Sequence, residues 1–216
     1  MEIKTINNRS RKVILFFAGW DISHQQFEHL KGGDYDIVIF NDYTNINADI
    51  YNIVKSYKQI NVIACGAGVW AASATFDKLY YSLSAPGKFR IIRLLKKMGK
   101  AIAIDGTLCP VSNIWGIPQQ KFNIMAEQNQ RTLKELKAFN ENYLFSNAIV
   151  WSKAVISRDN PVFPAANQER FWSEYNLCTD RNKKLVFNTS EFSIVYNKKS
   201  HFPFEEYEKW DSILDL

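Results

Sequence analysis

A turn with two glycines, Gly66 and Gly68, spans Cys65–Gly68. The residues before it form an apolar run typical of a strand, and the residues after it are typical of a helix. Strand, sharp turn and helix in succession make the nucleophile elbow, with the pattern small-x-nucleophile-x-small. Ala64 and Gly68 supply the small residues, but the nucleophile position holds Gly66. A glycine has no side chain with which to attack a carbonyl carbon.

Two simpler structures also fit these glycines: a tight strand-to-helix connection, or a phosphate-binding turn at a helix N-terminus. The second needs a longer glycine pattern or a lysine, and Gly-x-Gly alone does not identify it. Cys65 adjoins the nucleophile position, but we expect it to be a small buried apolar residue. Ser73 and Thr75 lie two or more helical turns beyond the elbow tip and do not replace the nucleophile.

Two residues farther along the chain are candidate catalytic partners. Asp159 follows a strand-like run, and His201 follows the last such runs. The order along the chain is nucleophile position, Asp159 and His201, which is the order of α/β-hydrolase triads. In such a triad the carboxylate orients the imidazole, and the imidazole serves first as general base and then as general acid. Taken singly, Asp159 also fits a turn or helix cap, and His201 a packed surface residue. With the elbow, the order favours a catalytic pair, and we predict that the two side chains hydrogen-bond.

A second glycine turn ends the first strong strand, at Ala18-Gly19-Trp20. In hydrolases of this type, one oxyanion-hole amide comes from such a turn and another from the residue after the nucleophile. These would be the backbone N–H groups of Trp20 and Ala67. Simple packing of the Trp20 ring is compatible with the same position.

These groups must be positioned by a scaffold. Along the chain, apolar strand-like runs alternate with helical stretches, and this alternation is typical of a mostly parallel sheet with helices on both faces. The expected helices are 69–79, 89–98 and a C-terminal helix over 205–216, and a polar amphipathic stretch over 120–147 reads as a helical cap insertion. We expect one domain, 1–216, with the α/β-hydrolase fold. The predicted strands are 13–17, 35–40, 60–64, 101–104, 153–157, 185–187 and 192–196.

Composition narrows the class of protein further. The 216 residues include three widely spaced cysteines without a CxxC pair, which argues against a disulfide framework or zinc site and for a reducing cytoplasm. We expect no cofactor and no metal. No run is long and apolar enough for a membrane span, and the polar N-terminus is not a signal peptide. The net charge of +5 is modest, and no motif accompanies the basic run 88–100, so nucleic acid is not the expected partner.

Several motifs together resemble one known family, the BioG-type pimeloyl-acyl-carrier-protein methyl ester esterases of biotin synthesis. That family reads Trp-Ser-Met-Gly-Val-Trp where this chain has Cys65-Gly66-Ala67-Gly68-Val69-Trp70. The motifs are 15–20, Tyr35-Asp36 with Asp42-Tyr43, 68–72, Gly106-Thr107 with 116–118, Ser157-Arg158-Asp159 and Pro164-Ala165-Ala166-Asn167-Gln168. Ser200-His201-Phe202-Pro203-Phe204 is similar to an element of related biotin-pathway esterases.

The resemblance implies hydrolysis of the methyl ester of a pimeloyl chain carried on acyl carrier protein, with Gly66 at the serine position. Impaired or absent catalysis follows, and the alternative is a non-catalytic protein that binds the acyl chain or its carrier. Arg131, Lys134 and Lys137 recur at helical spacing and would form a positively charged stripe. This stripe is either the binding site for the carrier protein, which is acidic in this family's substrate, or an ordinary solvated helix face. The sequence does not specify the oligomeric state.

Overall fold

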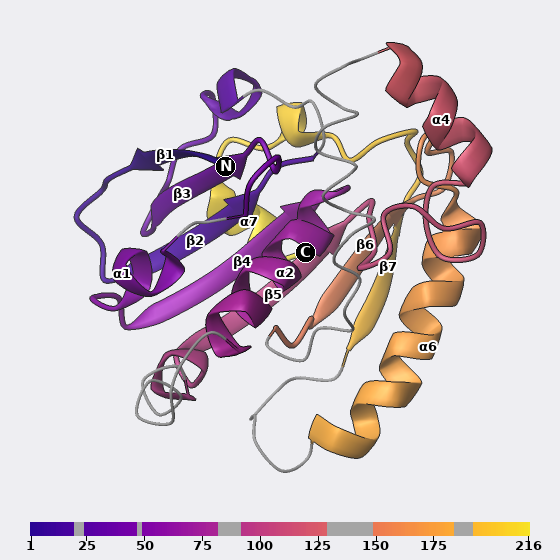
Figure 1. Cartoon of the computed structure of the whole chain (residues 1–216). Helices are drawn as coiled ribbons and strands as arrows, with labels where there is room; N and C mark the ends of the chain where they lie inside the picture. Colours follow the sequence, from indigo (N-terminus) through magenta and orange to yellow (C-terminus); the bar gives the residue numbers. More distant parts are fainter. Residues whose placement is uncertain (20–23, 47–48, 82–91, 129–148, 184–191) are drawn as a thin grey trace.

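The structure, a computed structural model, describes residues 1–19, 24–46, 49–81, 92–128, 149–183 and 192–216. Its centre is a seven-stranded sheet in the order β1-β3-β2-β4-β5-β6-β7 (Figure 1). β1 pairs with β3 in the antiparallel sense, and the other neighbouring strands are parallel. The strands are β1 (Glu2–Ile6), β2 (Lys12–Phe17), β3 (Asp36–Asn41), β4 (Gln59–Cys65), β5 (Met98–Ile104), β6 (Lys153–Ser157) and β7 (Ser193–Asn197).

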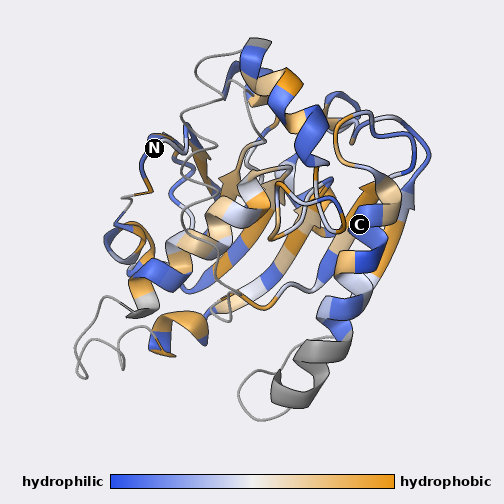
Figure 2. Ribbon diagram, turned by 45° about the vertical axis from the view of Figure 1, so that its right-hand side comes forward, coloured by the Kyte–Doolittle hydropathy of each residue, from blue (hydrophilic) through white to orange (hydrophobic). Residues whose placement is uncertain are grey.

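Side chains of the central strands point alternately into two buried layers, as the two-residue period of a strand requires. On β2, Val13, Leu15 and Phe17 enter one layer, while Ile14 and Phe16 enter the other. Both faces of the sheet are therefore apolar, and the strands are orange along much of their length in Figure 2. This burial explains why the central strands are nearly continuous apolar runs in the sequence.

Helices cover both faces. The first layer contains residues of α1, α2 and α6, and the second contains residues of η1, η2 and α7 (Figure 1). No helix in the described residues is long and apolar enough to cross a bilayer. The helical segments are η1 (His24–Phe27), α1 (Ile50–Val54), α2 (Gly68–Tyr81), α4 (Gln119–Gln128), α6 (Ala165–Lys183), η2 (Phe204–Glu206) and α7 (Trp210–Leu214).

The predicted scaffold is confirmed in its centre and corrected at its margins. Six predicted strands and the helix after the glycine turn are present, whereas the run 185–187 lies outside the described residues. Of the helix predicted over 89–98, residues 92–95 are helical, and Met98 already opens β5. The helix predicted over 205–216 is instead η2 and α7, separated by residues 207–209, of which Tyr207 and Lys209 are extended. Of the stretch 120–147 predicted to be a helical cap insertion, the described part is helical and belongs to α4, and residues 129–147 lie outside the described residues.

Parallel strands end at one edge of a sheet, and this edge is where open α/β sheets place ligands. Five connections leave the carboxyl ends of parallel strands at this end of the sheet, those of β2, β4, β5, β6 and β7. These connections begin at Ala18, Gly66, Asp105, Arg158 and Lys198. The candidate site is built from these connections.

Candidate active site

Gly66 has the backbone of a nucleophile elbow. It follows β4 directly and has a φ of +54°, in the left-handed region, and α2 begins two residues later. A Cβ added at Gly66 would meet the Cα of Gly19 at 3.6 Å, an ordinary van der Waals distance. A Cβ at Gly68 would come within 2.2 Å of the carbonyl oxygen of Phe17, so only glycine fits there. The strand, turn and helix of an elbow are therefore present, with room for a side chain that the chain does not have.

One of the two expected oxyanion amides lies in the described part of the chain. Ala67 is fully buried, and among the described residues its N–H donates no hydrogen bond. An unpaired N–H at the start of a helix is suited to stabilise a developing negative charge. Trp20, the second predicted donor, lies outside the described residues, although Gly19 before it lies beside the elbow.

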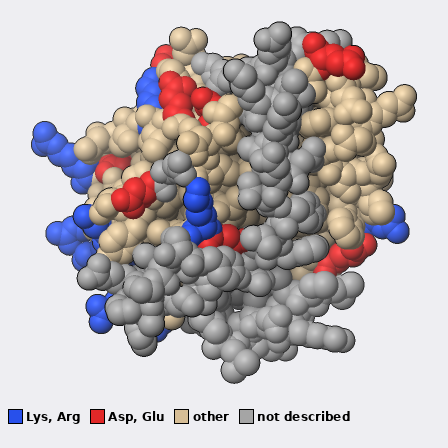
Figure 3. All heavy atoms as spheres, viewed as in Figure 1, with Lys and Arg blue, Asp and Glu red and all other residues tan. Residues whose placement is uncertain are grey.

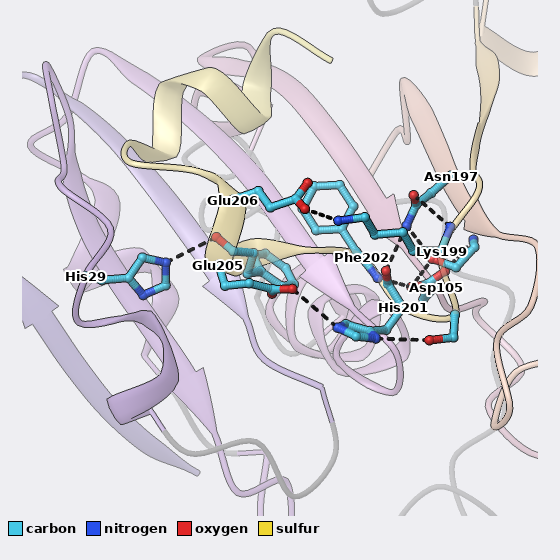
Figure 4. Close-up of polar contacts among 11 residues, drawn as sticks. His29, Asp105, Asn197, Lys199, His201, Phe202, Glu205 and Glu206 are labelled. Atoms are coloured by element: carbon cyan, nitrogen blue, oxygen red, sulfur yellow. Dashed lines mark hydrogen bonds and ion pairs between the residues drawn. The ribbon is translucent and has the colours of Figure 1, made fainter.

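The segment that carries His201 is held firmly, but the imidazole itself is exposed. Its side chain is 65% exposed and contacts Glu205 through Nε2 at 3.6 Å and the Ser200 hydroxyl through Nδ1 at 3.3 Å (Figure 4). After it in the chain, Phe202 and Phe204 are buried in the second layer. The backbone around the histidine is thus anchored, while the ring faces solvent and a neighbouring carboxylate.

Asp159 does not contact His201 in this structure. It is exposed, two residues after β6, and makes no hydrogen bond among the described residues. Its neighbour Arg158 lies over the ring of Tyr196, 5.1 Å from the centroid. The sheet brings the two ends of β6 and β7 together, but the predicted hydrogen bond between Asp159 and His201 is not formed. The catalytic role of Asp159 remains a prediction.

The structure reveals a buried carboxylate directly after the predicted strand 101–104, at a residue that the sequence did not mark as functional. Asp105 follows β5, is 6% exposed, and has a φ of +48°. Its Oδ1 accepts a hydrogen bond of 2.7 Å from the N–H of Ser157, and its Oδ2 accepts bonds of 2.8 Å from the Ser157 hydroxyl and 3.0 Å from the N–H of Phe202. Figure 4 shows Asp105 beside Phe202, the residue after His201.

Burial governs the ionisation of this region. It raises the pKa of the Asp105 carboxyl, although hydrogen bonds from Ser157, Phe202 and Asn160 act in the opposite direction. Burial likewise raises the pKa of the Cys65 thiol, and the nearby charge of Asp105 adds to this effect. Because the thiolate is the nucleophilic form, this shift argues against Cys65 as a replacement for the missing serine. This result supports the expectation that Cys65 is a buried apolar residue.

The predicted carrier-binding residues Arg131, Lys134 and Lys137 lie outside the described residues. The basic run 88–100 is partly described. Lys97 precedes β5 and donates to the carbonyl of Lys55 beside α1, at the edge of the sheet opposite the elbow. Blue side chains gather at the left and lower left of Figure 3, on the α1 side. That part of the run is therefore remote from the candidate site.

Comparisons with known proteins place this geometry in a family. Residues 1–138 match the model of the family described as pimeloyl-ACP methyl esterase BioG. A malonyl-[acyl-carrier protein] O-methyltransferase of Bacteroides fragilis is 28% identical over an alignment of 198 residues, and the match covers 76% of this chain and 37% of that protein. This chain therefore spans little more than a third of that relative.

Two solved structures show the same fold. The crystal structure of BioG from Haemophilus influenzae matches with a TM-score of 0.75 and 19% identity, over 98% of this chain and 99% of that one. An α/β hydrolase from the metagenome of Mar Chica lagoon sediments matches with a TM-score of 0.53 and 9% identity, over 99% and 92% of the two chains. The chain thus has the α/β-hydrolase fold and belongs to the BioG family of pimeloyl-ACP methyl esterases.

Proposed function

We propose that this protein binds a methyl-esterified acyl chain carried on acyl carrier protein, in the cytoplasm, and that its hydrolysis of the ester is impaired or absent. The observation behind this proposal is Gly66, which has the backbone of a nucleophile elbow and no side chain. The substrate class comes from the family to which the chain belongs. Without a nucleophile, no acyl-enzyme intermediate forms at this position.

The His201 imidazole and the N–H of Ala67 support a reaction in a single step, slower than one with a serine nucleophile. A water molecule attacks the ester carbonyl, His201 accepts its proton, and the N–H of Ala67 stabilises the oxyanion. The bond between the carbonyl carbon and the methoxy oxygen then breaks, and methanol leaves with the proton. In serine proteases, removing a triad member leaves a residual rate on the order of 10³–10⁴ over water, so a low rate is compatible with this site.

The test is to restore the nucleophile with Gly66→Ser, using Gly66→Ala as the matched control for backbone strain. Both variants add a Cβ where the nearest atom is 3.6 Å away, so both are expected to fold. We expect Gly66→Ser to hydrolyse short-chain p-nitrophenyl esters at least about a hundredfold faster than Gly66→Ala. A folded Gly66→Ser no faster than Gly66→Ala would show that the site has lost more than the serine.

A second candidate function is non-catalytic binding on the same fold. It is favoured by the position of His201, whose ring contacts Glu205 rather than an acid of the triad type. The two candidates differ in turnover. The methyl ester of pimeloyl-acyl carrier protein would be mixed with the parent protein, and binding and methanol release would be followed together. Saturable binding without methanol release supports the binding protein, whereas slow release supports the impaired esterase.

The partner has a separate test. If the stripe Arg131, Lys134 and Lys137 binds the acidic carrier, affinity falls between low and physiological salt, because exposed charges are screened within about 8–10 Å. Replacing all three residues by Glu is expected to slow association more than it changes stability. Surface plasmon resonance with holo carrier protein measures this effect. Equal affinities for the parent and the triple variant would make the stripe an ordinary solvated face.

A further inference from the structure

The peptide bond between His201 and Phe202 is held at both of its polar ends. Its carbonyl oxygen, on His201, accepts a hydrogen bond of 2.8 Å from Asn197 Nδ2. Its N–H, on Phe202, donates a hydrogen bond of 3.0 Å to Asp105 Oδ2. The orientation of this peptide sets the direction of the Cα–Cβ bond of His201, and therefore the region that the imidazole can reach.

Both anchors belong to one hydrogen-bonded group. Ser157 donates to Asp105 from its N–H at 2.7 Å and from its hydroxyl at 2.8 Å, and its hydroxyl oxygen accepts from Asn197 Nδ2 at 3.0 Å. The group joins the ends of β5, β6 and β7 to the histidine segment, as Figure 4 shows. We call Asp105, Ser157, Asn197 and the His201–Phe202 peptide the histidine clasp.

A carboxylate suits the centre of this clasp for a physical reason. Its two oxygens accept hydrogen bonds from the N–H of Ser157, the hydroxyl of Ser157, the N–H of Phe202 and the side chain of Asn160. Only an ionised carboxylate offers acceptors alone, and hydrogen bonds to a charged acceptor are shorter and stronger than neutral ones. Among the described groups, the titratable neighbour that faces it is Cys65, and no cation pairs with it.

The clasp also holds a strained backbone. Asp105 has a φ of +48°, in a region that residues with a side chain rarely occupy. Strain of this kind persists where surrounding contacts fix the conformation, and it concentrates at functional sites. Here the fixing contacts are hydrogen bonds to β6 and to the histidine segment, at the end of the sheet that carries the elbow.

We propose that Asp105 is a positioning residue, which sets the region that the His201 imidazole can reach by holding the His201–Phe202 peptide at the end of the sheet that carries the elbow. It acts through His201 and does not contact the substrate. This assignment rests on the proposed function for its catalytic consequence, but the clasp itself has a readout that requires no activity.

The first experiment measures amide hydrogen exchange by NMR in the full chain. In the parent, we expect the Phe202 amide to exchange slowly, because it is bonded to a buried carboxylate. Asp105→Ala is expected to speed exchange at Phe202 by about tenfold to a hundredfold while the β2 and β4 amides keep their protection. Asp105→Asn, which keeps one carbonyl acceptor, is expected to restore part of the protection. Asp159→Asn, the matched control, leaves Phe202 unchanged.

The second experiment repeats the two Asp105 variants in the Gly66→Ser background and follows ester hydrolysis. A positioning role predicts that Asp105→Asn lowers kcat by about tenfold or more with KM within about twofold, since misplacing a catalytic group slows chemistry rather than binding. Unchanged exchange at Phe202, or an equal loss of protection across the whole sheet, would overturn the clasp. If Asp105→Ala does not fold, Ser157→Ala tests the same clasp by removing one hydroxyl. If Gly66→Ser gains no activity, the proposed function fails, while the exchange data still decide the role of Asp105.

Discussion

Gly106 packs against Gly66 so closely that a Cβ at Gly106 would lie 2.1 Å from the carbonyl oxygen of Gly66. The turn after β5 and the elbow after β4 therefore form one packed unit. The N–H of Gly66 also donates to the carbonyl of Ile104 at 2.8 Å, and the indole N–H of Trp172 donates to the carbonyl of Gly106 at 3.0 Å. The geometry of the elbow thus depends on residues that are distant in the chain, Ile104 and Gly106 directly and Trp172 through Gly106.

This packing predicts that Gly106→Ala displaces the elbow. The added methyl group overlaps backbone atoms, which cannot move aside as the end of a flexible side chain can, and overpacking of this kind costs about 1–3 kcal/mol. Urea unfolding of the parent and the variant measures the loss. Gly66→Ala is the control, because its Cβ has room and only its backbone is strained, at about 1–2 kcal/mol. If Gly106→Ala were as stable as the parent, the two turns would not be in contact.

A second prediction concerns covalent labelling at the elbow. Fluorophosphonates react with an activated serine hydroxyl, and the parent has none at position 66. We expect no adduct on the peptide containing position 66 in the parent and a stoichiometric adduct there in Gly66→Ser. Mass spectrometry locates the adduct. Labelling of the parent at Ser73 would instead identify a displaced nucleophile and contradict the proposed impairment.

The thiol beside the elbow gives a third prediction. Burial raises the pKa of Cys65, and the charge of Asp105 raises it further. We therefore expect iodoacetamide to alkylate Cys65 in the folded protein at least about a hundredfold more slowly than in urea, as measured by peptide-resolved mass spectrometry. Cys65→Ala should leave any ester hydrolysis intact. Rapid alkylation together with loss of hydrolysis in Cys65→Ala would make Cys65 the nucleophile.

A fourth prediction follows from the ionisation of Asp105. Its native pKa is raised above the ordinary value, so the folded protein binds the proton more tightly than the unfolded chain does. The contribution of Asp105 to the free energy of unfolding therefore falls as pH rises from the ordinary carboxyl pKa through the raised native value. Asp105→Asn removes this dependence.

The measurement is urea unfolding of the parent and Asp105→Asn between about pH 4 and pH 7. The difference in stability should shift in favour of the variant as pH rises. Comparing the two proteins at each pH cancels the titration of carboxylates that the substitution leaves untouched. Asp159→Asn is the matched control at an exposed carboxylate. A difference that does not change with pH would show that Asp105 titrates normally.

The elbow could be predicted from the sequence because its signals are local. An apolar strand, a glycine turn and a helix lie within 59–81, and each part is recognisable from a few neighbouring residues. The central strands were predictable for the same reason, since burial on both faces makes them continuous apolar runs. β1 was missed because it is an edge strand with exposed polar residues such as Glu2. The long helix α6 was not predicted either.

The clasp was not predictable because its contacts are not local. Asp105 looks like the end of a strand in sequence, and its partners Ser157 and Phe202 are 52 and 97 residues away. The orientation of the His201 ring was missed for a related reason. Its contacts with Ser200 and Glu205 are near in sequence, but they depend on the turn between β7 and η2, which has no strong sequence signal.

The order of strands in the sheet has a consequence for how quickly this protein reaches its native state. β2, β4, β5, β6 and β7 are joined by long crossovers, and the groups at their carboxyl ends meet only when all five strands are in register. Chains dominated by such distant pairings fold in about milliseconds to seconds. Their folding is slow because the chain loses the entropy of loop closure before the distant contacts form and stabilise it. The hydrogen bond from Phe202 to Asp105 closes a loop of 97 residues. We therefore expect the elbow to form early in folding and the histidine segment to reach its native position in the last kinetic phase.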